Sequence, residues 1–125
     1  MQDIKNFYVD HLKNSLLPFW FKHGIDSEYG GYHTCFENVG TKRMSTDKYA
    51  WSQGRMVFML ARLAGMDIFT AEEQANMLAL SKSGADFLMK NVLMENGHCA
   101  FLMERDGTHK LSGAYIPMDA SIYAD

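Results

Sequence analysis

The stretch "DKYAWSQGRMVFMLARL", residues 47–63, decides the fold, because it combines an apolar helical pattern with one cation that is hard to place. We predict a helix from Asp47 to about Ala64, capped by Thr46 or Asp47 and stopped by the following glycine. Residues 56–61 are apolar around the full circumference, which is typical of a helix buried on all sides. Arg55 directly precedes this run, and its guanidinium cannot be deprotonated in a protein.

Two interpretations of Arg55 follow from its spacing. Lys48, Ser52, Arg55 and Arg62 fall four, three and seven residues apart, which is also the pattern of a solvated stripe on an amphipathic helix. Met59 interrupts that stripe, however, and a charge on a buried helix must be paired or must face a polar cavity. The spacing alone leaves both the solvated stripe and the cavity wall open.

Composition limits the classes of protein that this chain can belong to. Its 125 residues are one domain's worth at most, and a hydrophobic content of 47% allows a packed core. The net charge of −3 is spread without a basic stripe, so the sequence favours neither nucleic acid nor a membrane surface as a partner. The N-terminus lacks the apolar region of a signal peptide, and no apolar run approaches membrane-spanning length. With only Cys35 and Cys99, both expected to be free thiols, we expect a cytoplasmic location.

On the N-terminal side of this stretch, apolar residues at helical spacing predict a helix over residues 2 to about 22. Pro18 should kink this helix or end its regular part. Residues 25–46 contain paired glycines, an alternating apolar pattern and a turn-like "ENVG", which predict a short hairpin.

On the C-terminal side, Thr70 and Glu73 have the spacing of a capping box, which predicts a helix to about Asn91. This helix carries small residues at the middle of one face, which favours close contact with a neighbour. A second hairpin should turn at Asp106-Gly107, and Asp119 should cap the start of a fourth helix.

Other candidate sites have weaker support in the sequence. His33-x-Cys35 and His98-Cys99 could supply four zinc ligands, but the spacing gives no support and we predict no metal site. Four aromatic side chains could form a sugar-stacking platform, although packing in the core or a hairpin is the commoner fate. These four are Trp20, Tyr29, Tyr32 and Trp51.

Several segments together resemble one known family. They are "FWFKHGIDSEYGGYHTCFENVG", "DKYAWSQGR", "CAFLMERDGT" and "SIYAD", in this order along nearly the whole chain. They are similar to the N-terminal part of the N-acylglucosamine 2-epimerase family, also called renin-binding protein, which includes cellobiose 2-epimerases and related sugar isomerases. The Glu-Tyr-Gly-Gly-Tyr and Trp-x-Gln-Gly-Arg segments are the most specific parts of this resemblance.

The resemblance implies a mainly α fold, the N-terminal third of an (α/α)6 barrel with about four helices and short β-hairpin inserts. Six inner helices of such a barrel line a cavity and six outer helices surround them. Residues 1–125 would form an incomplete barrel domain, truncated within the fourth helix. Asp47 to Ala64 would be the first inner helix, and Arg55 would then point into the substrate cavity.

The resemblance also implies a chemistry, which is epimerisation or isomerisation of a sugar by deprotonation and reprotonation at C2 through a cis-enediolate. Arg55 would be the catalytic group that stabilises the negative oxygen, because a guanidinium is planar and permanently cationic. Trp51, one turn earlier, and Phe101, on the second hairpin, would contact the sugar. The family's acid/base histidines lie on later helices, and no histidine here matches them, so the chain alone is expected to be inactive.

Two other functions remain open beside this one. The same barrel can host a glycoside hydrolase, which requires two facing carboxylates. A non-enzymatic helical interaction module would be favoured if the face around Arg55 were flat and solvated. For the epimerase we expect a small-molecule sugar as the partner and no cofactor, while the sequence leaves homo-oligomerisation and the identity of the sugar undecided.

Overall fold

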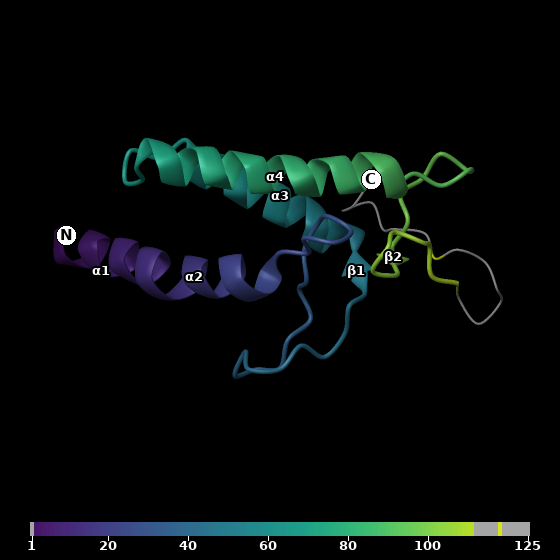
Figure 1. Ribbon diagram of the computed structural model, residues 1–125, viewed down its shortest axis with the longest axis horizontal. Coiled ribbons are helices and arrows are strands. Elements are labelled where there is room, and N and C mark those ends of the chain that lie inside the picture. The colour runs from purple at the N-terminus through teal and green to yellow at the C-terminus, as the bar shows by residue number, and fades with distance from the viewer. Residues whose placement is uncertain (1, 112–117, 119–125) are drawn as a thin grey trace.

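The computed structural model describes residues 2–111 and residue 118, and this part of the chain is mainly helical. Residues 2–111 form three helical segments and one two-stranded sheet. In Figure 1, α3 (Ala50–Ala64) and α4 (Ala71–Asn91) run side by side, and the N-terminal helical segment, residues 2–24, lies along them. None of the described helices is long and apolar enough to cross a membrane.

The helix expected over residues 2 to about 22 is present, but only its beginning is regular. It comprises α1 (Gln2–His11), a π-helical stretch (Leu12–Leu16), α2 (Leu17–Phe19) and a second π-helical stretch (Trp20–Gly24). Pro18 lies inside α2, between the two π-helical stretches. Proline has no N–H to donate to the preceding turn, so a change in the hydrogen-bond pattern around it is physically expected. The regular α-helix ends at His11, before the proline.

The prediction for α4 is confirmed. The Thr70 side chain accepts a hydrogen bond from the Glu73 amide, and the Glu73 carboxylate accepts one from the Thr70 amide, which completes the capping box. The small residues of this helix do allow close contacts. Ser81 Oγ donates to the Val57 carbonyl oxygen of α3 at 2.9 Å, and Gly84 packs against the Tyr32 ring.

The prediction that α3 begins near Asp47 with a cap at Thr46 or Asp47 is wrong. The helix starts at Ala50 with Tyr49 as its N-cap, and no side chain caps it. Residues Lys48–Tyr49 form strand β1 instead, and the Asp47 carboxylate accepts a hydrogen bond from Lys110 Nζ at 3.0 Å. Asp47 therefore does not cap the helix, and its carboxylate instead pairs with a lysine from a distant part of the chain.

The two predicted hairpins are only partly present. Between residues 25 and 46 there are two isolated bridges, Ile25 with Tyr32 and Phe36 with Arg43, and no regular strand pair. In the second region Asp106-Gly107 does form the turn, and Gly107 has a φ of 97°. Strand β2 (Leu102–Met103) pairs antiparallel with β1, however, so the sheet joins the two loop regions. The predicted fourth helix from Asp119 lies outside the described residues, so three of the expected four helical segments are observed here.

The core consists of two clusters of buried side chains. One joins the N-terminal segment, α3 and α4, and the other joins the sheet end of α4 to β2. The first contains Leu17, Tyr32, Leu60, Leu63, Ala64, Phe69 and Met77, and the second contains Ala50, Phe87, Met94, Ala100 and Met103.

Residues 56–61 are not buried on all sides in the described part of the chain. Leu60 is 2% exposed, whereas Phe58 is 64% and Met59 42% exposed. Only one face of α3 packs on α4 and on the loop that holds Tyr32, so the apolar residues on its other faces keep part of their contact with solvent.

Candidate functional site

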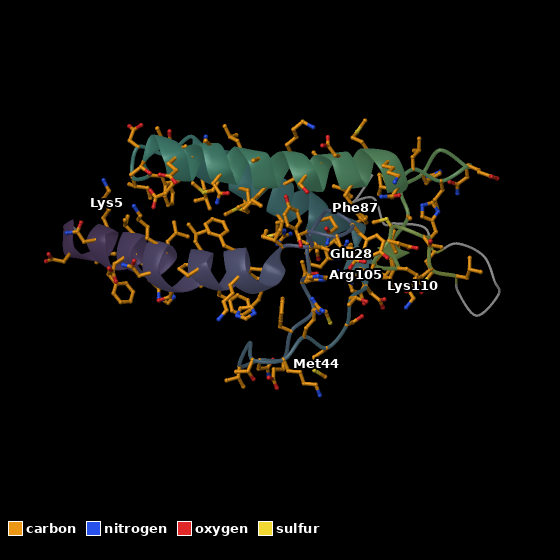
Figure 2. The ribbon with its side chains drawn as sticks, in the orientation of Figure 1. Lys5, Glu28, Met44, Phe87, Arg105 and Lys110 are labelled. Carbon is orange, nitrogen blue, oxygen red and sulfur yellow. The ribbon has the colours of Figure 1, made fainter. Side chains whose placement is uncertain are left out.

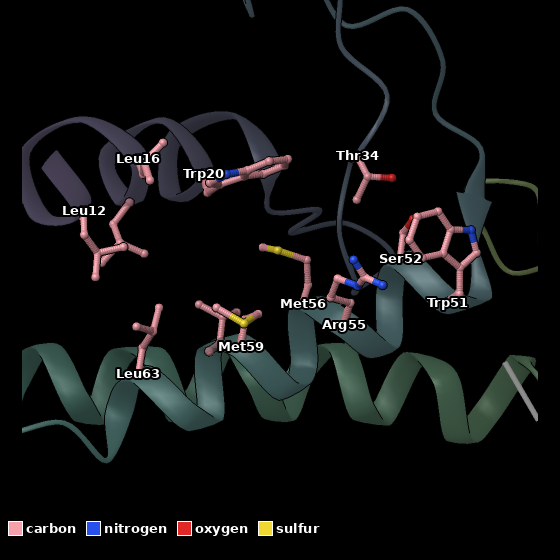
Figure 3. A pocket seen from close by; sticks show the side chains of 12 residues that line it. Leu12, Leu16, Trp20, Thr34, Trp51, Ser52, Arg55, Met56, Met59 and Leu63 are labelled. Atoms are coloured by element: carbon pink, nitrogen blue, oxygen red, sulfur yellow. The ribbon is translucent and has the colours of Figure 1, made fainter. Parts of the chain in front are cut away.

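A cavity of about 360 Å³ lies between the N-terminal helical segment and α3 (Figure 3). Its wall is built from three parts of the chain: the π-helical and α2 turns, the loop at Thr34, and the exposed face of α3. The lining residues are Leu12, Leu16, Leu17, Trp20, Thr34, Trp51, Ser52, Arg55, Met56, Met59, Leu60 and Leu63. Arg55 is thus on a cavity wall even though its side chain remains exposed.

Arg55 and Trp51 form a pair on this wall. They are four residues apart on α3, which puts them on the same face one turn apart. The guanidinium carbon of Arg55 lies 5.0 Å from the centre of the Trp51 ring, within the range of a cation–π contact. Such a contact restrains a long flexible side chain and favours one position of the charge. In Figure 3 the guanidinium points from α3 toward the side where Thr34 lies.

The cavity has a polar end and an apolar end (Figure 3). Thr34, Ser52, Arg55 and the Trp51 indole lie at one end. The other end is bounded by leucine and methionine side chains, namely Leu12, Leu16, Met59 and Leu63.

Phe101, the third residue predicted from the resemblance, is not among the residues that line this cavity. Its ring packs edge-on against Tyr49, with 5.4 Å between ring centres, and its carbonyl oxygen accepts a hydrogen bond from the Ala50 amide. Phe101 therefore contacts the start of α3, whereas Arg55 and Trp51 are brought together on the cavity wall. Its contact with a sugar stays a prediction.

At the start of α3 lies an ion cluster that the sequence patterns did not predict, centred on the buried carboxylate of Asp26. This carboxylate accepts hydrogen bonds from Lys48 Nζ at 3.0 Å and from Arg105 Nε and Nη2, both at 2.9 Å. The Lys48 side chain is fully buried, and its ammonium lies 4.2 Å from the centre of the Phe87 ring. Figure 2 shows Arg105 beside Glu28, with which it forms a second ion pair at 2.9 Å. The cluster ties the first loop, β1 and the second loop together at the start of α3.

Burial and neighbouring charges shift the pKa values in this cluster. Burial alone would raise the pKa of Asp26, but hydrogen bonds from Arg105, Lys48 and the Tyr29 amide outweigh it and hold that pKa well below its usual range. Burial lowers the pKa of Lys48, and the contact with Asp26 partly opposes this. Burial, followed by the positive charge of Arg43, lowers the pKa of His33, whose Nε2 lies 3.7 Å from Asp26 Oδ2.

The remaining sequence candidates do not gather into a site. Within residues 2–111 and residue 118, no group of three or more histidine, cysteine or acidic side chains could hold a metal ion. Cys35 and Cys99 are not joined by a disulfide. Of the four aromatic residues considered as a sugar platform, Trp20 and Trp51 line the cavity, Tyr32 is 1% exposed in the core, and Tyr29 packs on Arg105.

Comparison with proteins of known sequence finds N-acylglucosamine 2-epimerases as relatives. The chain is 38% identical to the human N-acylglucosamine 2-epimerase over 95 residues, which cover 74% of this chain and 21% of the human protein. It is 34% identical to the mouse N-acylglucosamine 2-epimerase over 101 residues, which cover 79% of this chain and 23% of that protein. No protein-family profile matches the sequence.

Solved structures with a similar fold include a cellobiose 2-epimerase from Bacillus thermoamylovorans, with a TM-score of 0.73 and 18% identity. That alignment covers 86% of this chain and 26% of the epimerase. A D-mannose isomerase aligns with a TM-score of 0.67 and 20% identity, over 83% of this chain and 25% of the isomerase. The chain thus spans about a quarter or less of each of these relatives. Within that span, it is homologous to the family of N-acylglucosamine 2-epimerases and cellobiose 2-epimerases.

Proposed function

We propose that this chain supplies part of the catalytic cavity of a sugar 2-epimerase or isomerase, and that Arg55 is its catalytic cation. In this proposal α3 is the first inner helix of an (α/α)6 barrel, and its exposed face borders the substrate cavity. The observation that carries the proposal is the position of Arg55, stacked on Trp51 at the polar end of a cavity of about 360 Å³. The homology to sugar epimerases supports the assignment of the reaction class.

The reaction needs a fixed positive donor at one step. Once the sugar ring has opened, a base removes the proton from C2, and the electron pair of that C–H bond forms a C1–C2 double bond. The carbonyl oxygen at C1 then becomes negative, and the intermediate is a cis-enediolate. A guanidinium held beside that oxygen stabilises the charge as it develops, and return of a proton to the other face of C2 inverts its configuration.

Three features of the polar end of the cavity suit this step. The charge of Arg55 is permanent, so Arg55 does not compete with the acid/base groups for protons. The Trp51 ring holds the guanidinium on one side and leaves its N–H groups free to donate in the plane. Ser52 and Thr34, at the same end of the cavity, offer hydroxyls that can hydrogen-bond the hydroxyls of a sugar.

Acid/base groups for the proton transfer do not line the described cavity wall, which contains no histidine and no carboxylate. In a sugar 2-epimerase they would come from other helices of the barrel. The two carboxylates that a glycoside hydrolase needs are likewise absent from this part of the wall, so the homology to sugar epimerases, and not the wall, favours the epimerase over the hydrolase. A helical interaction module would be favoured by a flat face around Arg55, and this face is hollowed instead.

The test uses a hybrid protein in which this chain replaces the aligned segment of the human relative. The hybrid is incubated in D₂O with N-acylmannosamine, mannose or cellobiose, and deuterium incorporation at C2 is followed by NMR. We expect exchange with one of the three sugars and a loss of about 10²–10³-fold in Arg55→Ala, the usual cost of losing one oxyanion donor. The matched control is Arg62→Ala, because Arg62 is an exposed arginine on the same helix outside the cavity lining. A folded hybrid in which both variants exchange at the same rate would refute the role of Arg55.

A further inference from the structure

Besides the arginine, the Trp-x-Gln-Gly-Arg segment contains a glutamine whose side chain is fully buried. Gln53 is 0% exposed and uses both ends of its amide on a single partner, the backbone of Tyr32. Its Oε1 accepts from the Tyr32 amide at 2.8 Å, and its Nε2 donates to the Tyr32 carbonyl oxygen at 2.9 Å. A neighbouring strand would bond to the residue in the same way, so Gln53 replaces a strand partner for this loop.

The paired glycines of the loop make this approach possible. Gly31 has a φ of 71°, which glycine adopts without strain, and a Cβ at this position would lie 2.7 Å from Gln53 Oε1. The Glu-Tyr-Gly-Gly-Tyr and Trp-x-Gln-Gly-Arg segments, 21 residues apart in the chain at the bonded residues, are therefore joined through one amide group.

Gln53 also has a defined place relative to the catalytic face of α3. At 100° per residue, Trp51 and Arg55 share one side of the helix and position 53 lies about 200° from each of them, on the opposite side. No side chain caps the start of α3, so its first turns depend on tertiary contacts. The same loop makes a contact to β1, just before the helix, and one to the first turn of the helix: Asp26 binds Lys48, and Tyr32 binds Gln53.

We infer that Gln53 is a positioning residue, which fixes the first turns of α3 against Tyr32 and thereby holds Arg55 in its contact with Trp51. The inference rests on the proposed function only for the chemical role of Arg55, and the geometry itself can be measured without any sugar.

The experiment follows the Trp51 indole and Arg55 Nε–H signals by ¹⁵N NMR in this chain and in Gln53→Glu. A neutral glutamic acid can still accept from the Tyr32 amide and donate to its carbonyl oxygen, but an ionised one places a negative oxygen against that carbonyl. We expect wild-type signals at about pH 5, where burial keeps the new carboxyl neutral. Well above the pH at which the buried carboxyl ionises, the Trp51 signal should move at least about halfway to its position in Arg55→Ala. At that pH, exchange of the Tyr32 amide should be at least about tenfold faster in Gln53→Glu than in the wild type at the same pH.

The matched control is Ser81→Ala, which removes another hydrogen bond to α3, the partly buried one from Ser81 to the Val57 carbonyl oxygen. It should lower the melting temperature without moving the Trp51 or Arg55 signals. The inference is overturned if Trp51 keeps its wild-type signal while the Tyr32 amide is deprotected, or if Ser81→Ala moves the signal equally. Global unfolding of both Gln53→Glu at high pH and Gln53→Asn would also overturn it, because the amide would then hold the whole fold and not this face. Absence of sugar turnover would affect the proposed function and leave this measurement unchanged.

Discussion

Replacing Asp26 by asparagine should be among the most damaging single changes in the described structure. The carboxylate accepts hydrogen bonds from Lys48, from two nitrogens of Arg105 and from the amides of Glu28 and Tyr29. The asparagine side chain would keep one oxygen acceptor and turn an NH₂ group toward one set of these donors. Lys48, whose side chain is fully buried, would then carry a charge without a counter-ion.

The expected magnitude follows from that unpaired charge. Removing one partner of a buried ion pair typically costs about 3–5 kcal/mol, which for a chain of this size lowers the melting temperature by about 10–20 °C. Since Lys48 causes much of the cost, the double variant Asp26→Asn with Lys48→Met should be less destabilised than the sum of the two single variants. The exposed pair Lys82–Asp86 provides the matched control, because Asp86→Asn should cost less than about 1 kcal/mol.

Urea unfolding followed by circular dichroism measures these differences, and an unchanged m-value shows that stability changed without a change in the surface exposed on unfolding. A loss below about 1 kcal/mol for Asp26→Asn, equal to that of Asp86→Asn, would refute the reasoning. So would strict additivity of Asp26→Asn and Lys48→Met.

Three further predictions concern the packing, the pH dependence and the activity. Gly84→Ala should lower the free energy of unfolding in urea by about 1–3 kcal/mol or more, because the new Cβ would collide with the ring and hydroxyl of Tyr32. Adding Tyr32→Phe should not relieve the collision, since the ring carbons are as close as the hydroxyl. Because the pKa of His33 is lowered in the folded chain, the unfolded chain binds a proton first as the pH drops, and stability should fall below about pH 6.5. The variant His33→Gln should show a smaller fall in the urea midpoint between about pH 7 and pH 5. The unmodified chain alone should give no measurable C2 deuterium exchange by NMR with N-acylmannosamine, mannose or cellobiose, because no histidine or carboxylate lines the described cavity, and exchange above the buffer rate would contradict this.

Local sequence patterns predicted where the helices lie, whereas contacts between segments far apart in the chain were not predicted. The capping box of Thr70 and Glu73 is contained in four residues, so the start of α4 could be predicted. Strands β1 and β2 have two residues each, too few for an alternating pattern, and their pairing moves the start of α3 to Ala50.

The candidate site shows the same division. Trp51 and Arg55 are one turn apart on a helix, so their meeting on one face follows from the sequence. The partners of Asp26 are 22 and 79 residues away in the chain, and no local pattern indicates that Lys48 and Arg105 meet there. One signal was present: Lys48 directly precedes an apolar helical stretch, and a charge there needs a partner. Only the fold shows that this partner is Asp26. Phe101 could be placed on the second loop region but not on the cavity wall, because the strand pairing turns it toward Tyr49.

The most direct test of Arg55 as the oxyanion-stabilising group is the steady-state kinetics of Arg55→Lys in the hybrid with the human relative. Lysine keeps the positive charge but loses the planar array of donors and the stacking on Trp51. If Arg55 stabilises the enediolate, kcat should fall by about 10²–10³-fold while KM changes little, because the interaction is made chiefly in the transition state. An unchanged kcat, or a rise in KM alone, would show that Arg55 binds the sugar or shapes the cavity wall without stabilising the intermediate.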